Sequence, residues 1–329
     1  MGDGYDAEDI ARGTYRTVME QQMEYFFAVE PYKTYRQYFN VGVAVAMSYE
    51  SGIHDNPDLW RQPKFNTTYG VADNGRLDFD FDECMRYVLQ DVDQCPVTTA
   101  NVDRSLIIAV PNANAYEGVT MLYGSGAAIA VCPYWESTSY PYDARGIVQH
   151  EAGGHGFGKL DDEYIYHRNH IDQCGCNCCS HSDAVRGMQA MGWARNVSLT
   201  GKYKTIKWRH LIFDRRYSDI VDIYDGSHMH ADGIYRSEVN SCMNNNVPYF
   251  STISRQAIVE RIKDYVGEAF DFEQFVANDS REMGDKFLTR GNAGATPATA
   301  GHHYSEHHGV IIRNGSPLDY FGKNKKLKK

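Results

Sequence analysis

The spacing of apolar residues predicts helices in three parts of the chain. Across residues 7–29, hydrophobic side chains recur at intervals of three and four, which is typical of an amphipathic helix. Pro31 limits this helix, because the residue before a proline avoids the helical backbone region. The same spacing predicts helices over 83–92 and over 254–266, the latter with Ser254 as its N-cap.

Short apolar runs predict buried strands at 37–47, 105–110 and 124–132. The third run begins Gly124-Ser125-Gly126, a weak candidate for an anion cradle. We expect 167–200, which is polar and Cys-rich, to be an irregular inserted loop, and 290–308 to be a linker or lid. Strands and helices alternate early, and helices and loops dominate later. This order predicts an α/β (α+β) fold, in which helices stack on a mixed sheet and a smaller irregular part follows.

The composition is that of a globular protein, with 42% hydrophobic and 23% charged residues in a chain of 329. A net charge of −10 argues against nucleic acid as the main partner. No apolar run approaches the roughly 20 residues that a membrane-spanning helix needs. Residues 1–5 lack the basic start and apolar core of a signal peptide, so we expect either a cytoplasmic protein or a trimmed sequence.

Cysteines and aspartates raise two further possibilities for metal or disulfide chemistry. Four of the eight cysteines are clustered in the sequence CGCNCC at 174–179, for which we favour a structural role as a disulfide-stapled loop or a soft-metal clip. The others are Cys84, Cys95, Cys132 and Cys242. Asp78, Asp80 and Asp82 alternate as calcium ligands can, but they lack the Gly and Glu of an EF-hand loop. An acidic helix N-terminus is the favoured interpretation.

The strongest chemical signal is a pair of histidines, His150 and His155, with Glu151 beside the first. Neutral imidazoles bind zinc, and an adjacent carboxylate can hold and deprotonate a metal-activated water. Zinc-binding histidines on a regular helix are four residues apart, whereas these are five apart, about 140° around the axis. Either the similarity is accidental, or a π-bulge takes up the extra residue. Gly153-Gly154 favours the bulge, because glycine tolerates distorted backbone.

The whole segment from His150 to Tyr164, HEAGGHGFGKLDDEY, resembles the signature of the M64 peptidase family, the IgA-peptidase-like metallopeptidases, with one extra residue before His155. Other blocks resemble the same family in order: GDGY at 2–5, EPY at 30–32, FNV at 39–41, SYESG at 48–52, YGSG at 123–126, IYR at 234–236 and SCM at 241–243. Together these blocks cover about residues 2–266.

This resemblance implies a metzincin-like zincin fold, with a zinc helix, a lower subdomain containing a Met-turn at Met243, and a C-terminal helix. It implies one catalytic Zn²⁺ held by His150 and His155, with Glu151 as general base. The implied third ligand is Asp162, which matches the family's DEY block, and Asp161 is the alternative. The supporting residues would be Glu163 and Tyr164 around the ligands, and Arg236 at a substrate carboxylate or in a structural ion pair.

Other histidines offer weaker candidates for metal binding. His228 and His230 are a second possible pair, because positions i and i+2 share one face of a strand. Two more pairs, His302-His303 and His307-His308, lie in a polar stretch where metal binding would be adventitious.

The resemblance therefore implies a secreted or cell-surface zinc endopeptidase that cuts extracellular proteins. One alternative is a peptidase-like surface domain that binds protein or glycan without cutting it, and another is a zinc amidase acting on peptidoglycan peptides. We expect a single catalytic domain over 1–289, with an upper part to about residue 160 and a lower part over about 161–289. A polar C-terminal extension would follow over 290–329.

Overall fold

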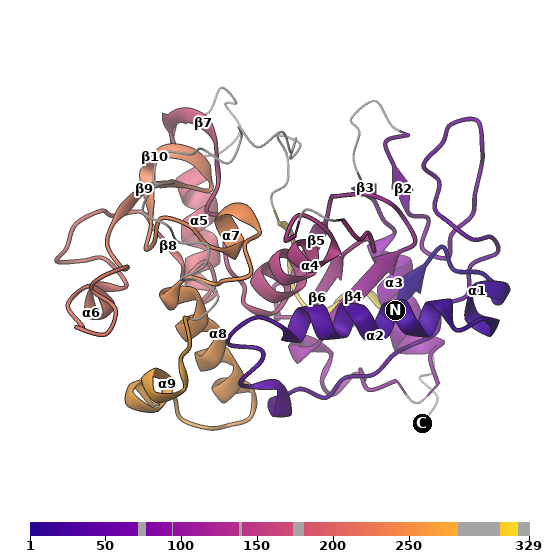
Figure 1. Ribbon diagram of the computed structural model, residues 1–329, viewed down its shortest axis with the longest axis horizontal. Helices are drawn as coiled ribbons and strands as arrows, with labels where there is room; N and C mark the ends of the chain where they lie inside the picture. Colours follow the sequence, from indigo (N-terminus) through magenta and orange to yellow (C-terminus); the bar gives the residue numbers. More distant parts are fainter. Residues whose placement is uncertain (72–76, 94, 138–139, 174–180, 282–309, 322–329) are drawn as a thin grey trace. The chain divides into compact units, whose positions relative to one another are not determined.

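The computed structural model describes residues 1–71, 77–93, 95–137, 140–173, 181–281 and 310–321 (Figure 1). The chain divides into two compact units. Unit 1 comprises residues 1–27, 37–157 and 307–329, and unit 2 comprises 28–36 and 158–306.

Unit 1 is built on a five-stranded mixed sheet in the order β1-β4-β6-β5-β11 (Figure 1). The strands are β1 (Gly2–Asp3), β4 (Leu106–Pro111), β5 (Val119–Tyr123), β6 (Ala128–Val131) and β11 (Ile311–Arg313). β4 runs parallel to β1 and β6, while β5 runs antiparallel to β6 and parallel to β11. A separate small ribbon pairs β2 (Thr68–Tyr69) with β3 (Leu77–Asp78). The predicted mixed sheet and the strand predicted at 105–110 are confirmed.

The amphipathic segments predicted at 7–29 and 83–92 are helical in unit 1, which also contains helices that were not predicted. The helices of unit 1 are α1 (Ala7–Ala11), α2 (Thr14–Phe27), α3 (Phe81–Gln90), α4 (Ala144–Val148), α11 (Pro317–Phe321), the short 3₁₀ turn η2 (Val102–Arg104) and the π-helix η3 (Gln149–Phe157). The single helix predicted over 7–29 is divided at Gly13, whose φ of 82° belongs to the left-handed region. Asp80 caps α3 by accepting a hydrogen bond from the Glu83 backbone at 2.9 Å. This confirms the acidic helix N-terminus and gives Asp80 a structural role.

The strand predicted at 37–47 is wrong. The 3₁₀ turn η1 (Arg36–Tyr38) is followed by residues 39–48 without regular structure. Side-chain hydroxyls replace a strand partner: Tyr15 Oη donates to the Ala44 carbonyl at 2.6 Å and lies 3.2 Å from the Ala46 amide. The alternating apolar side chains are exposed rather than buried, namely Val41, Val43, Val45 and Met47.

The strand predicted at 124–132 is shorter than expected, because β6 begins at Ala128. Gly124-Ser125-Gly126 forms the turn of the β5–β6 hairpin instead, with the Gly126 amide donating to Tyr123 at 2.8 Å. The weak anion-cradle interpretation therefore gives way to a hairpin turn, and Gly126 has a φ of 118° that this turn requires.

The C-terminal segment was expected to be a polar extension, but its described residues belong to the fold of unit 1. β11 pairs in parallel with Met121–Tyr123 of β5. Leu318 and Phe321 of α11 pack against the hydrophobic core beside the sheet, and Ser316 Oγ donates to Asp103 at 2.6 Å. The linker or lid predicted at 290–308 lies outside the described residues.

Unit 2 contains a second sheet in the order β7-β10-β8, with β9 also paired to β10. Its strands are β7 (Ile165–His170), β8 (Val197–Ser198), β9 (Tyr224–Ser227) and β10 (Met229–Arg236). Its helices are α5 (His181–Ala190), α6 (Arg209–Ile212), α7 (Cys242–Asn245), α8 (Thr252–Tyr265) and α9 (Phe272–Asn278). β7 runs parallel to β10, and β8 and β9 run antiparallel to it.

Two expectations for unit 2 need correction. The segment 167–200 is not a wholly irregular loop, because it contributes β7, the ten-residue helix α5 and β8. The clustered cysteines 174–179 lie outside the described residues. The predicted helix at 254–266 is confirmed as α8, but its N-cap is Ser251, and Ser254 lies within the first turn. The Ser251 and Ser254 hydroxyls share a hydrogen bond of 2.8 Å.

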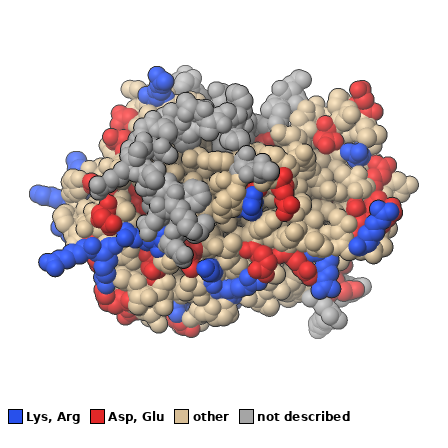
Figure 2. All heavy atoms as spheres, viewed as in Figure 1, with Lys and Arg blue, Asp and Glu red and all other residues tan. Residues whose placement is uncertain are grey.

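Surface charge and helix length concern the predictions about nucleic acid and membranes. Acidic and basic side chains of the described residues are interspersed on the face drawn in Figure 2. Within the described part of the chain, no helix is both long and apolar enough to cross a membrane.

Candidate metal centre

The histidine motif lies on η3, the π-helix that continues directly from α4. Asp143 caps α4 by accepting a hydrogen bond from the Arg145 backbone at 2.9 Å. A π-helix is hydrogen-bonded between residues five apart, so His150 and His155 return to the same face. The π distortion predicted from their spacing is confirmed, and it extends over the whole of Gln149–Phe157.

One face of η3 packs closely against the sheet of unit 1. A Cβ added to Gly156 would lie 2.6 Å from Leu106 Cδ1 of β4, so a larger residue here would require the Leu106 side chain to move. A Cβ on Gly118, just before β5, would lie 2.5 Å from Glu151 Cγ. These two glycines let the π-helix approach the strands closely enough to bury almost all of its residues.

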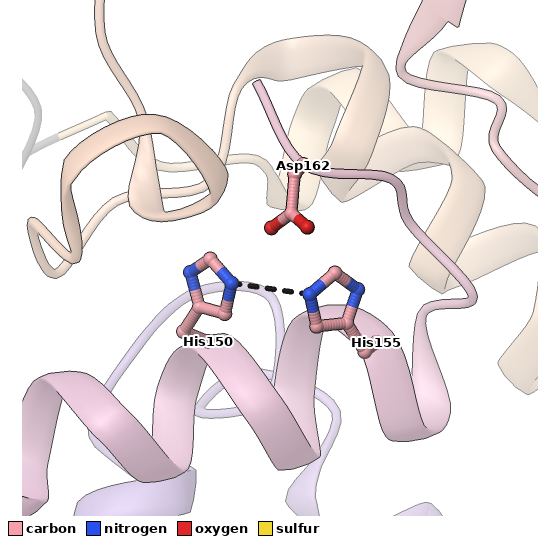
Figure 3. Close-up of side chains that lie close together, drawn as sticks. All are labelled: His150, His155 and Asp162. Carbon is pink, nitrogen blue, oxygen red and sulfur yellow. Dashed lines mark hydrogen bonds between the residues drawn. The ribbon is translucent and has the colours of Figure 1, made fainter. Parts of the chain in front are cut away.

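His150 and His155 face one another with their Nε2 atoms 3.1 Å apart (Figure 3). His150, His155 and Asp162 each offer one ligand atom, and these atoms all lie within 4.8 Å of one another. Two nitrogens bound to a tetrahedral zinc ion at its usual bond length are about 3.3 Å apart. The two imidazoles and the carboxylate therefore fit a zinc ion, and all three residues are buried.

Asp161 has different partners from Asp162. Its carboxylate contacts His228 Nδ1 at 2.9 and 3.1 Å, and its Oδ1 accepts a hydrogen bond from the Asp162 backbone at 2.9 Å. Burial acts to lower the pKa of His228, but the charge and hydrogen bond of Asp161, together with the charge of Asp162, outweigh it and raise that pKa above its ordinary value. The grouping with the two motif histidines thus involves Asp162, while Asp161 forms an ion pair with His228.

Glu151 is next to His150 and is held by the neighbouring strand. Thr120 Oγ1 on β5 lies 2.7 Å from Glu151 Oε2 and 3.1 Å from the Glu151 carbonyl oxygen. Glu151 is only partly buried, whereas its neighbours along η3 are buried. One carboxylate oxygen is therefore fixed by a hydroxyl from the sheet, and the side chain keeps contact with solvent.

The family model described as IgA Peptidase M64 matches residues 1–212, well over half of the chain. The chain belongs to the M64 peptidase family. It is therefore a metallopeptidase, as its sequence motifs imply, and its substrates are proteins or peptides. No curated protein matches the chain significantly.

In this M64 peptidase, Glu163 ties the Asp162 segment to the segment that contains Met243. The Glu163 amide donates to the Met243 carbonyl at 2.8 Å, and its carboxylate accepts hydrogen bonds from Ser241 Oγ at 2.5 Å and Asn196 Nδ2 at 2.9 Å. Burial raises the pKa of Glu163 to about 7. These hydrogen bonds join Glu163 to the segment of Met243, which is fully buried in α7.

Tyr164 and Arg236, the other two residues expected near the site, make contacts within unit 2. Tyr164 is buried, with its ring 5.0 Å from that of Tyr166. The guanidinium of Arg236 donates to the backbone carbonyls of Asp225 and Gly226 in the adjoining strand β9. The substrate role considered for Arg236 stays a prediction.

The second predicted histidine pair does not form. His228 and Met229 both have positive φ, 46° and 67°, so the backbone is not a regular strand here. His228 turns to Asp161, whereas His230 contacts Asn169 and His181. Of the possible calcium ligands, Asp82 pairs with Arg313. The four histidines at 302–303 and 307–308 lie outside the described residues.

Sequence reasoning missed the residues that support the motif. Thr120, Gly118, Asn196 and Ser241 are far from it in sequence and carry no distinctive spacing. The SCM block that includes Ser241 was recognised, but only for its methionine. The strand β5 itself was not predicted, so no residue on it could be placed beside Glu151.

Proposed function

We propose that this M64 peptidase is a zinc-dependent endopeptidase that hydrolyses peptide bonds of extracellular protein substrates, with Glu151 as general base. The observation that carries the proposal is the convergence of His150, His155 and Asp162 beside Glu151. These are one acid–base group and three ligand groups of the kind that catalytic zinc sites use.

Zinc bound by these residues would polarise the scissile carbonyl and lower the pKa of water toward neutrality. Glu151 accepts the proton of the attacking water and delivers it to the leaving amine. Thr120 fixes one Glu151 oxygen at 2.7 Å and leaves the other for that proton. Asp162 adds a carboxylate to the two imidazoles, which gives the nitrogen and oxygen ligand set that zinc takes.

The π-helix weakens the alternative of a binding domain that no longer cuts. That alternative depended on the five-residue spacing, which on a regular helix would separate the two histidines. With their Nε2 atoms 3.1 Å apart, the spacing no longer opposes a shared metal ion.

The variant Glu151→Gln tests the general base. Glutamine keeps the size and the hydrogen bond to Thr120 but cannot accept the proton, so we expect peptide cleavage to fall by at least about 10²-fold with zinc retained. Cleavage is measured on a peptide library by mass spectrometry, and zinc by elemental analysis. Glu20→Gln, a surface carboxylate on α2, is the matched control and should cleave normally.

Full activity in Glu151→Gln would overturn the assignment of the general base. A second arm tests the substrate: cleavage of muropeptides without cleavage of proteins would replace the endopeptidase by a peptidoglycan amidase.

A further inference from the structure

Three histidines of unit 2 converge on one face of its sheet. His167 on β7 and His230 on β10 are direct partners in the parallel pairing of these strands, so their side chains lie on the same face. His181 is the first residue of α5. It reaches the same place, with its ring centroid 4.9 Å from that of His230.

The contact between His181 and His230 resembles the contact within the catalytic motif. His181 Nδ1 lies 2.7 Å from His230 Nε2, and the corresponding distance between His150 and His155 is 3.1 Å. The ring centroids are 4.9 and 4.8 Å apart, both in an edge-to-face arrangement. The His167 ring lies 5.4 Å from that of His230.

The neighbours of His230 leave its Nε2 atom available as a metal ligand. Its Nδ1 lies 3.0 Å from Asn169 Oδ1, an acceptor, so Nδ1 carries the proton and the lone pair is on Nε2, which faces His181. His230 is buried, at 1% exposure.

We propose that His181, His230 and His167 form a second metal site, for Zn²⁺ or a similar borderline divalent cation. Three imidazoles suit such ions, whereas magnesium and calcium prefer oxygen ligands. His181 and His230 supply the first two ligands. The ligand atoms of His167, His181 and His230 do not all lie within 4.8 Å of one another, as those of His150, His155 and Asp162 do. Metal binding would therefore require the partly buried His167 ring to turn toward the other two.

This site would be structural, because it joins the start of α5 to two strands of the sheet. His228 is left out of the ligand set: its ring lies 6.2 Å from that of His181, but its Nδ1 is engaged by Asp161. The competing explanation is a simple hydrogen bond between His181 and His230, which needs no metal.

Cobalt titration of a protein without the motif histidines separates the two explanations. In the His150→Ala/His155→Ala double variant, we expect one equivalent of Co²⁺ to bind and give visible d–d bands without the near-ultraviolet charge-transfer band of a thiolate ligand. Adding His181→Ala or His230→Ala should abolish these bands. His210→Ala, which removes a histidine bonded to Gln256 in the same unit, should leave them intact.

Absence of Co²⁺ binding in the double variant would leave only the hydrogen bond and overturn the proposal. So would bands that survive both His181→Ala and His230→Ala, or bands dominated by thiolate. His181 is only partly buried, so its variant should fold even if replacing His230 does not. Asn169→Ala should weaken binding by about 10- to 100-fold, as expected for loss of a ligand's orienting partner. Because the test protein lacks the catalytic motif, its outcome is independent of the proposed peptidase mechanism.

Discussion

The protein brings histidines together in two ways. On η3, His150 and His155 meet because one helical segment is wound more widely than usual, within six residues of sequence. In unit 2, His181 and His230 meet across 49 positions, because a helix start and a strand are packed together. Similar nitrogen–nitrogen distances thus arise from local winding in one case and from tertiary structure in the other. The first depends on the length of a short segment, and the second on the stability of its supporting elements.

Changing the length of the motif should have the largest effect. Inserting one alanine after Gly153 places the histidines six apart, so they no longer share a face of the π-helix, and we expect catalytic zinc and cleavage to be lost. Deleting Gly154 gives a spacing of four, which a regular helix brings to one face, while the spacing from His155 to Asp162 is unchanged. We expect zinc to be retained, as measured by elemental analysis.

The pair of length variants also tests the comparison directly. Neither should alter Co²⁺ binding at the cluster of His167, His181 and His230. Zinc retained after the insertion would show that the winding of η3 does not determine the site.

Gly118→Ala should have an intermediate effect that is confined to the helix site. The new Cβ would lie 2.5 Å from Glu151 Cγ and displace the carboxylate. A displacement of about 1 Å at a catalytic group costs about 10²-fold in rate, so kcat should fall by about that factor with zinc retained. Steady-state kinetics measure the change, and an unaltered kcat would mean that Glu151 does not depend on its packing against the sheet.

Gly187→Ala should have the smallest effect, and it concerns the element that carries His181. Gly187 lies within α5, and an added Cβ would meet nothing within 4 Å. We expect the free energy of unfolding to rise by up to about 1 kcal/mol, because alanine favours the helix, with peptidase activity unchanged. Urea denaturation measures it.

The matched control for that substitution is Gly192→Ala, just after α5. Its φ of 76° is unfavourable for alanine, so this variant should be destabilised. If Gly192→Ala were more stable than Gly187→Ala, the result would contradict the position at which α5 ends in the structure.

The sequence predicted what depends on neighbouring residues and failed where distant contacts decide. The spacing of His150 and His155, with two glycines between them and the motif residues that follow, favoured the π distortion that the structure shows. The apolar run at 37–47 gave a false strand, because hydroxyls from Tyr15 and Tyr87 take backbone hydrogen bonds that a partner strand would take. The contact of His230 with His181 could not be predicted, since it depends on the pairing of β10 with β7 and on where α5 begins.

The pairing of β11 with β5 has a consequence for how unit 1 is completed. Met121 is paired with Ile311, 190 positions later in the chain, so this edge of the sheet is among the most non-local contacts in the fold. During synthesis, β5 is made long before its partner, and its outer row of amides and carbonyls stays open to other strands until Ile311–Arg313 emerge. The slow, non-local closure of this edge makes the nascent chain, rather than the finished enzyme, the form most exposed to mispairing and aggregation.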